Sequence, residues 1–294
     1  IIPLDSAHQT NLQAAYDMIE WLTRNDVKVG ITGKAFTYEG HTYPAGTMVV
    51  SMYQAKRAVA NGVLYDGTLI RNWTDLYSEG ITAFNYTPGF DMVVCAEPDA
   101  YEAIASAVSV TLDYEDALDF LAENAKSQFA GVAGQNVVIS NSSEDAVAAV
   151  NALLEDGKQV GMITEGDYEG DFLCSYEDWL SISEEYVLTG TSVGTADMTA
   201  YVLEKAPVVY ISGTVAAEAE STSGYVHTAR ITSSSYNYDR MAMELMGFKT
   251  TNDASEADVV IGATALDEGG LAAVQDGVPY IGYTASAMRT VNTE

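Results

Sequence analysis

The side chains best suited to metal or acid–base chemistry in this 294-residue sequence are its three histidines, His8, His41 and His227. A catalytic zinc site normally takes about three His, Asp or Glu ligands, two of them from a short motif such as H-E-x-x-H. No histidine here has an acidic residue three positions later, and H-E-x-x-H does not occur. We therefore assign no metal-binding residue and expect the chain to hold no zinc.

His41 is the histidine with the clearest local pattern, because it follows Glu39-Gly40 and precedes the sequence Pro-Ala-Gly. Residues 36–43 have the pattern of a tight hairpin that turns at Glu39-Gly40, and Gly46 can take the positive φ of a second turn. We predict that His41 is a partly exposed hairpin residue rather than a ligand or a catalytic base.

A serine nucleophile is the second candidate for catalysis. The sequence "GTSVG" at 190–194 matches the G-x-S-x-G nucleophile elbow, with Ser192 at its centre. Downstream of Ser192 the only histidine is His227, and the only aspartate between them is Asp197, five residues from the serine. An α/β-hydrolase takes its acid from a later strand end, so the match is incomplete. A serine hydrolase using Ser192 is therefore an alternative, and we assign no catalytic residue.

Residues for ligand binding are less clearly marked. The acidic segment 165–172 lacks the regular oxygen spacing of a Ca²⁺ loop, and neither a P-loop nor G-x-G-x-x-G occurs. Trp73 and Tyr77 are expected to be packed and buried rather than to form a sugar platform. In open α/β sheets, ligands bind beside the carboxyl ends of the strands. The residues expected there are Thr164, Glu165, Ser212 and Thr214.

Helical and strand patterns alternate along the chain, as they do in α/β proteins. We predict an α/β fold of largely parallel sheets flanked by helices, with a β-hairpin insertion near residues 36–52. Two units are expected, 1–132 with the hairpin and 133–294. The stretches 14–32 and 146–164 share the order helix, polar break, strand, which fits two related units that each pack a helix on a parallel strand.

The charge of the chain restricts its partners. Forty-two acidic residues face 13 lysines and arginines, which gives a formal net charge of −29. This charge repels phosphates, so we expect no nucleic acid partner. No stretch reaches the roughly 18 apolar residues of a membrane span, so we expect no membrane insertion. The composition is typical of an exported bacterial protein or a salt-adapted one, and we predict an extracellular or cell-surface location.

The two cysteines leave the redox compartment open. Cys95 ends an apolar run, and Cys174 lies in the sequence "DFLCSY". Free cysteines are among the most buried residue types, so two buried thiols are the simpler expectation. A disulfide between them would be compatible with export.

The segment 38–64, "YEGHTYPAGTMVVSMYQAKRAVANGVL", resembles a region of large bacterial members of the zinc carboxypeptidase family. In that family a hairpin with Pro-Ala-Gly and two valines is followed by Q-x-x-R and a helix, and here Gln54 and Arg57 stand at these positions. The resemblance implies a region that follows the peptidase domain. It also implies a continuation, from about residue 136, into an α/β part similar to class I glutamine amidotransferases.

The catalytic groups that the resemblance would require are not found in this sequence. The family's zinc site has an H-x-x-E motif, a later histidine and a glutamate base, and amidotransferases use a cysteine in a G-x-C-x-G elbow. Neither Cys95 nor Cys174 lies in such an elbow. We interpret the chain as a non-catalytic accessory region of an exported zinc carboxypeptidase-like protein. It has no cofactor of its own, since zinc is expected only in the peptidase domain, which is absent from this chain.

The expected partners are that peptidase domain of the same polypeptide and a peptide or cell-wall ligand. A glycan- or solute-binding module is the other alternative to an accessory region.

Overall fold

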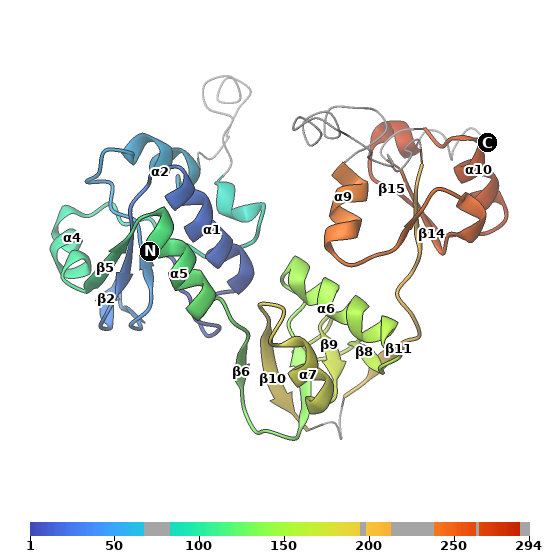
Figure 1. Ribbon diagram of the computed structural model, residues 1–294, viewed down its shortest axis with the longest axis horizontal. Helices are drawn as coiled ribbons and strands as arrows, with labels where there is room; N and C mark the ends of the chain where they lie inside the picture. The colour runs from blue at the N-terminus through green and yellow to red at the C-terminus, as the bar shows by residue number, and fades with distance from the viewer. Residues whose placement is uncertain (68–82, 195–197, 213–237, 263–264, 289–294) are drawn as a thin grey trace. The chain divides into compact units, whose positions relative to one another are not determined.

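The computed structural model describes residues 1–67, 83–194, 198–212, 238–262 and 265–288 (Figure 1). The chain divides into two compact units. The first comprises Ile1–Ala146 and Cys174–Asp197, and the second comprises Val147–Leu173 and Met198–Glu294. Helix α6 (Glu144–Glu155) and strand β9 (Phe172–Cys174) run from one unit into the other along the chain.

The first unit begins with a three-stranded antiparallel sheet in the order β4-β1-β5. Two helices that lie side by side, α1 and α5, cover one face of this sheet (Figure 1). The element bounds are α1 (Leu12–Arg24), β1 (Val29–Thr32), β4 (Met48–Val49), β5 (Val108–Leu112) and α5 (Tyr114–Asn124).

The core of the first unit follows from side-chain alternation along these strands. Val29 and Ile31 of β1 point to the helix-covered face, together with Met48 of β4 and Leu112 of β5. There they pack against the apolar stripe of α1, in which Ile19 is fully buried. The residues that alternate with these core residues along each strand lie on the opposite face of the sheet.

A hairpin extends from the end of β1. Its strands, β2 (Phe36–Tyr38) and β3 (His41–Tyr43), pair antiparallel around Glu39 and Gly40, whose φ values are 50° and 81°. The aromatic side chains of this pair pack with helix α4 (Pro98–Ala105) in a smaller core. Pairing ends at Tyr43, and β4 pairs with β1 instead, so the predicted insertion over 36–52 is divided between two sheets.

Three further strands belong to the first unit: β6 (Gln128–Ala130), β7 (Asn136–Ile139) and β10 (Thr189–Val193). Strand β10 is parallel to β6 and antiparallel to β7. Helix α7 (Tyr176–Ile182) places Trp179 directly over Gly190 of β10. The other described helices of this unit are α2 (Arg57–Val63) and the 3-10 helix η1 (Phe84–Tyr86).

The second unit contains strands of both kinds. Strand β8 (Val160–Ile163) pairs antiparallel with β9 and with β11 (Ala200–Leu203). The C-terminal sheet is entirely parallel, in the order β13-β12-β14-β15. Its elements are β12 (Val209–Ile211), α9 (Tyr238–Leu245), β13 (Thr250–Thr251), the 3-10 helix η3 (Ala254–Glu256), β14 (Val259–Gly262), α10 (Glu268–Gln275) and β15 (Tyr280–Gly282).

The predicted α/β class, with helices flanking the sheets, is confirmed. Among the described residues, parallel pairing is found between β6 and β10 and in the C-terminal sheet. Antiparallel pairing joins β1 to β4 and β5, β2 to β3, β7 to β10, and β8 to β9 and β11. The two compact units also differ from the predicted units 1–132 and 133–294. The reason is β10, which pairs with both β6 and β7 and therefore keeps 174–197 with the first unit.

The two similar stretches, 14–32 and 146–164, both have the predicted order of helix and then strand. Their strands β1 and β8, however, each lie between antiparallel neighbours, so the predicted parallel arrangement is wrong. None of the helices in the described part of the chain is both long enough and apolar enough to cross a bilayer.

Candidate functional site

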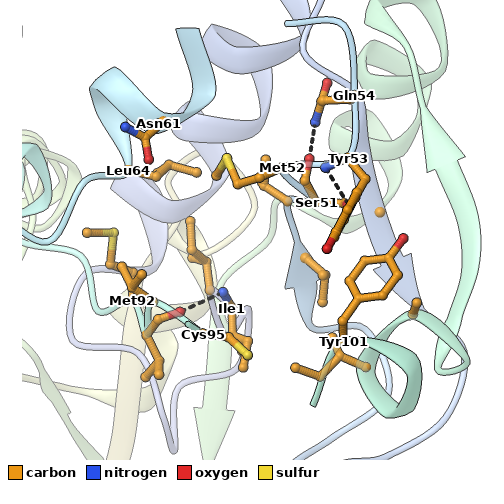
Figure 2. A pocket seen from close by; sticks show the side chains of 18 of the residues that line it. Ile1, Ser51, Met52, Tyr53, Gln54, Asn61, Leu64, Met92, Cys95 and Tyr101 are labelled. Atoms are coloured by element: carbon orange, nitrogen blue, oxygen red, sulfur yellow. Dashed lines mark hydrogen bonds between the residues drawn. The ribbon is translucent and has the colours of Figure 1, made fainter. Parts of the chain in front are cut away.

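A cavity of about 720 Å³ opens in the first unit, on the sheet face that α1 and α5 leave uncovered (Figure 2). This volume lies in the range of roughly 300–1,000 Å³ that is common for small-molecule sites. Most of its lining is apolar, with a few polar groups placed around it. That combination is typical of ligand-binding pockets.

The floor of the cavity is the exposed face of the β4-β1-β5 sheet. Gly30 pairs with Val49 of β4 and with Thr111 of β5, and all three line the cavity together with Val108. A Cβ on Gly30 would lie 3.0 Å from a methyl of Val108 and 3.2 Å from the Val49 carbonyl oxygen. The absence of a side chain at residue 30 thus lets the strands approach and leaves this face hollow.

One wall is the segment Ser51–Gln54, which Gln54 fastens to the sheet. The Gln54 side chain accepts a hydrogen bond from the Lys28 backbone N–H (2.7 Å) and donates to the Lys28 carbonyl (3.0 Å) and the Ser51 carbonyl (2.8 Å). The Tyr53 N–H donates to the Ser51 hydroxyl at 3.1 Å. These bonds fix the backbone that carries Met52 and Tyr53 beside the cavity (Figure 2).

Two tyrosines stand at one side of the cavity. The ring centroids of Tyr53 and Tyr101, the latter from α4, are 4.6 Å apart with the planes tilted by 54°. Tyr53 is 78% exposed and Tyr101 39%. Exposed aromatic rings next to a cavity present a π-face to whatever enters it.

The segment 92–97 forms another wall and places Met92 and Cys95 in the cavity (Figure 2). At the end of this segment the Glu97 carboxylate accepts a hydrogen bond from the Tyr38 hydroxyl of the hairpin. This bond, reinforced by burial, raises the pKa of the Tyr38 hydroxyl above its ordinary value. Tyr38 therefore stays a neutral donor and ties the hairpin to the cavity wall.

The charged groups of the lining are unevenly balanced. Two carboxylates, Asp66 and Glu97, and one ammonium group, Lys28, line the cavity. The Lys28 ammonium lies 3.7 Å from the Asp113 carboxylate. Among the described residues, neither Asp66 nor Glu97 has a base within ion-pair distance. The described lining therefore contains more carboxylates than bases.

The histidines do not meet at a common site in the described structure. His41 is the exposed first residue of β3, directly after the Glu39-Gly40 turn, as predicted. His8 is also exposed, and its Nδ1 lies 2.6 Å from an oxygen of Asp5. His227 lies outside the described residues. Among the described side chains, no group of three or more His, Cys, Asp or Glu residues is arranged to hold a metal.

Ser192 does not have the geometry of a nucleophile elbow. It lies inside β10, paired with Val137, rather than at a turn between a strand and a helix. Its hydroxyl accepts a hydrogen bond from the Val132 N–H at 2.8 Å. The first glycine of the motif, Gly190, is explained by packing, because a Cβ there would lie 2.7 Å from the Trp179 ring.

The residues predicted at strand ends have separate environments. Thr164 and Glu165 are exposed at the start of the loop between β8 and β9, and the Thr164 N–H donates to the Thr199 carbonyl at 3.0 Å. Ser212 is buried at the end of β12, where its hydroxyl accepts from the Asp267 N–H at 2.9 Å. The remaining positions, Thr214, Trp73 and Tyr77, lie outside the described residues.

Both cysteines are free thiols in the structure. Cys174 is 3% exposed, and burial raises the pKa of its thiol to about 12. Cys95 is partly exposed where it lines the cavity. The expectation of two buried thiols therefore fits Cys174 but not Cys95.

Sequence reasoning missed the cavity residues because they are apolar, aromatic or small. Val49 and Thr111 reach Gly30 by pairing of strands that are distant in sequence, and Tyr101 joins the site through packing of helix α4. One signal was present in the sequence: Tyr53 follows the apolar run "TMVVSM" as an exposed aromatic residue. Comparisons of this chain with protein-family models, with curated proteins and with solved structures found no match.

Proposed function

We propose that this chain is a non-catalytic, ligand-binding accessory region of an exported zinc carboxypeptidase-like protein. In this proposal the cavity of the first unit takes a small, mainly apolar ligand, such as part of a peptide or a cell-wall component. The observation that carries the proposal is the cavity of about 720 Å³ with its predominantly apolar lining. A site of this kind binds by burying apolar surface and selects by its few polar groups.

The location of the cavity supports the link to the family resemblance. The segment 38–64, which carries that resemblance, supplies the wall Val49–Gln54 and also Asn61 and Leu64. Gln54, the first residue of the Q-x-x-R sequence, is the side chain that fastens this wall to β1. The part of the sequence that resembles the family therefore also supplies one wall of the proposed site.

Zinc has no role in the proposed function of this chain. We expect it only in the peptidase domain of the same polypeptide, whose H-x-x-E motif would lie upstream of Ile1. Reading the gene upstream of Ile1 tests this part of the proposal. An open reading frame that encodes no such motif in the preceding few hundred residues would contradict the family assignment and leave the binding site as a separate question.

Cys95 offers a direct test of binding in the unmodified chain. We would measure the rate at which N-ethylmaleimide alkylates each cysteine, by mass spectrometry, with and without neutral aromatic alcohols, short sugars and short peptides. A ligand that fills the cavity should slow alkylation of Cys95. Cys174 is the internal control, because its buried thiol, with a pKa of about 12, should react only after unfolding.

A thermal-shift screen with the same compounds gives an independent readout. A ligand present at about 100 times its Kd stabilises a protein by roughly 2.7 kcal/mol, which is readily seen as a higher melting temperature. We expect at least one class of compound both to raise the melting temperature and to protect Cys95. If no compound does either, the binding part of the proposal is wrong.

A further inference from the structure

We propose that the cavity selects a cationic amphipathic molecule, with an apolar body and one amine or quaternary ammonium group. This inference rests on the proposed binding function of the cavity and adds the chemical class of its ligand. Three features of the described residues point to this class: the charge of the lining, the pair of tyrosines and the apolar floor.

The first feature is the excess of carboxylates over bases in the described lining of the cavity. Asp66 and Glu97 have no ion-pair partner among the described residues, whereas the only base of the lining, Lys28, already lies 3.7 Å from Asp113. The Ile1 nitrogen also reaches the cavity, where it donates to the Val93 carbonyl at 2.9 Å. In the longer polypeptide proposed above it is an uncharged peptide N–H, and as a free amino group in the 294-residue chain its pKa is lowered by burial to about 6. It therefore adds little positive charge at neutral pH.

The overall charge of the chain acts in the same direction. A formal charge of −29 repels anions and attracts cations over distances up to about a Debye length, which is about 8 Å at physiological salt. An anionic ligand would have to approach both this general field and the two carboxylates of the lining. A cationic ligand gains from both.

The second feature is the pair formed by Tyr53 and Tyr101. Their rings are in contact, with centroids 4.6 Å apart, and both are accessible beside the cavity. The face of a tyrosine ring carries partial negative charge and attracts ammonium groups, most strongly where water is excluded. The tyrosines and the carboxylates therefore favour the same kind of charge.

The third feature is the apolar floor of the cavity, which favours a ligand with an apolar body. Val49 and Val108 flank Gly30 on the sheet, and Leu64 and Met92 line the cavity around it. Burial of an apolar group against such a surface removes apolar area from water and is favourable. A small cation without an apolar part would gain none of this and should bind weakly.

Three matched probes test the inference: 2-phenylethylamine, 2-phenylethanol and 3-phenylpropanoate. They share an aromatic body and differ in charge. Dissociation constants would be measured at neutral pH and low salt from protection of Cys95 and from calorimetry. We expect the amine to bind about tenfold more tightly than the carboxylate, with the alcohol between them. Added salt should reduce this difference.

Charge-removing variants locate the effect. Asp66→Asn and Glu97→Gln should each weaken binding of the amine severalfold and leave binding of the alcohol unchanged. Asp119→Asn is the matched control, because it removes the same charge from the exposed face of α5, on the other side of the sheet. Circular dichroism and melting curves would show that each variant is folded. Since Glu97 also accepts a bond from Tyr38, Asp66→Asn is the cleaner variant.

The outcomes separate the two proposals. If the alcohol binds and the amine is no tighter than the carboxylate, the inference about charge is wrong and the binding function stands. The same conclusion follows if Asp66→Asn and Asp119→Asn weaken binding of the amine probe equally. If none of the three probes protects Cys95 and the wider screen also finds no ligand, the binding function itself has failed.

Discussion

Two places in this molecule combine polar side chains with the surface of a sheet, and they differ in what fills them. In the first unit, the uncovered face of the β4-β1-β5 sheet holds a cavity whose polar groups fix its walls. In the second unit, the carboxyl ends of β12 and β14 are where an open parallel sheet usually binds ligands. There the described polar groups bond to one another.

The bonds at the end of β12 show this internal pairing. The Tyr210 hydroxyl donates to the Asp267 carboxylate at 2.9 Å, and the same aspartate accepts from the Gly270 N–H at 2.7 Å as the N-cap of α10. Ser212 accepts from the Asp267 backbone. Polar groups of this kind stabilise the fold, whereas those around the cavity leave space for a ligand. A sheet topology associated with binding is therefore not enough to identify a site.

The largest expected effect is on stability, at a buried charge of the C-terminal sheet. The guanidinium of Arg240, which is 1% exposed, donates to the Thr250 hydroxyl (2.7 Å) and to Asn252 (3.2 Å). Arg240→Ala should lower the free energy of unfolding by about 2–4 kcal/mol, because packing and buried hydrogen bonds are lost together. Denaturant melts measure this change.

The control for this variant is another base in the same unit. Lys249 is 68% exposed and lies 3.0 Å from Glu155, so Lys249→Ala should cost no more than about 0.5 kcal/mol. If Lys249→Ala and Arg240→Ala lower the free energy of unfolding equally, the buried hydrogen bonds of Arg240 do not stabilise the C-terminal sheet as described.

The next effect concerns the turn that leads into β4. Gly46 has a φ of 90°, and its N–H donates to the Thr32 carbonyl at 2.7 Å. Gly46→Val should therefore cost about 1–3 kcal/mol, because a β-branched residue is forced into a left-handed conformation. His41→Ala should cost no more than about 0.5 kcal/mol, as at other exposed sites. If His41→Ala proves the more damaging variant in denaturant melts, His41 has a role that its exposed position does not explain.

A smaller effect is expected at Tyr210. Tyr210→Phe removes the hydrogen bond to Asp267 and should cost about 0.5–1.5 kcal/mol near neutral pH. Burial, together with the bond to Asp267, raises the pKa of the Tyr210 hydroxyl from 10.0 to about 12. The folded chain then holds this proton more tightly than the unfolded chain, so the benefit is lost as pH rises from 10.0 to about 12.

The pH dependence of stability shows which result would contradict the Tyr210 prediction. The stability difference between the original chain and Tyr210→Phe should shrink across this alkaline range. A difference that stays constant would mean that the hydroxyl does not titrate as described.

The smallest effect on stability is expected at the cavity. Tyr53 is 78% exposed, so Tyr53→Ala should change the free energy of unfolding by no more than about 0.5 kcal/mol. The same variant should weaken binding of the amine probe more than binding of the alcohol, because it removes one of the two rings that face the cation. A large loss of stability would show that Tyr53 belongs to the core instead.

Local patterns in the sequence were sufficient for some of these features. The Glu39-Gly40 turn and the positive φ of Gly46 follow from residue types at adjacent positions, and the structure has both. The order of helix and then strand in 14–32 also followed from local sequence patterns. The direction of strand pairing could not be predicted from local patterns, since β1 and β5 pair antiparallel across nearly 80 residues of chain. Pairing over such distances is decided by packing rather than by local propensity.

The cavity was harder to predict than any element that surrounds it. Gly30 matters because Val49 and Val108 approach it from two other strands, and nothing in the sequence around residue 30 shows this. Ser192 illustrates the reverse case. Its five-residue motif matched a catalytic nucleophile elbow, but in the structure Gly190 leaves space for the Trp179 ring. Short motifs predict function only when the fold supplies their geometry.

The central claim is that ligands bind to the cavity of the first unit and not at the carboxyl ends of the C-terminal sheet. Chemical-shift mapping of the ¹⁵N-labelled chain with 2-phenylethanol tests it most directly, since a neutral probe is independent of the charge inference. We expect the perturbed amides to cluster around the cavity, at Gly30, Tyr53, Asn61 and Val93. Perturbations confined to Ser212, Gly262 and Asp267 would contradict it.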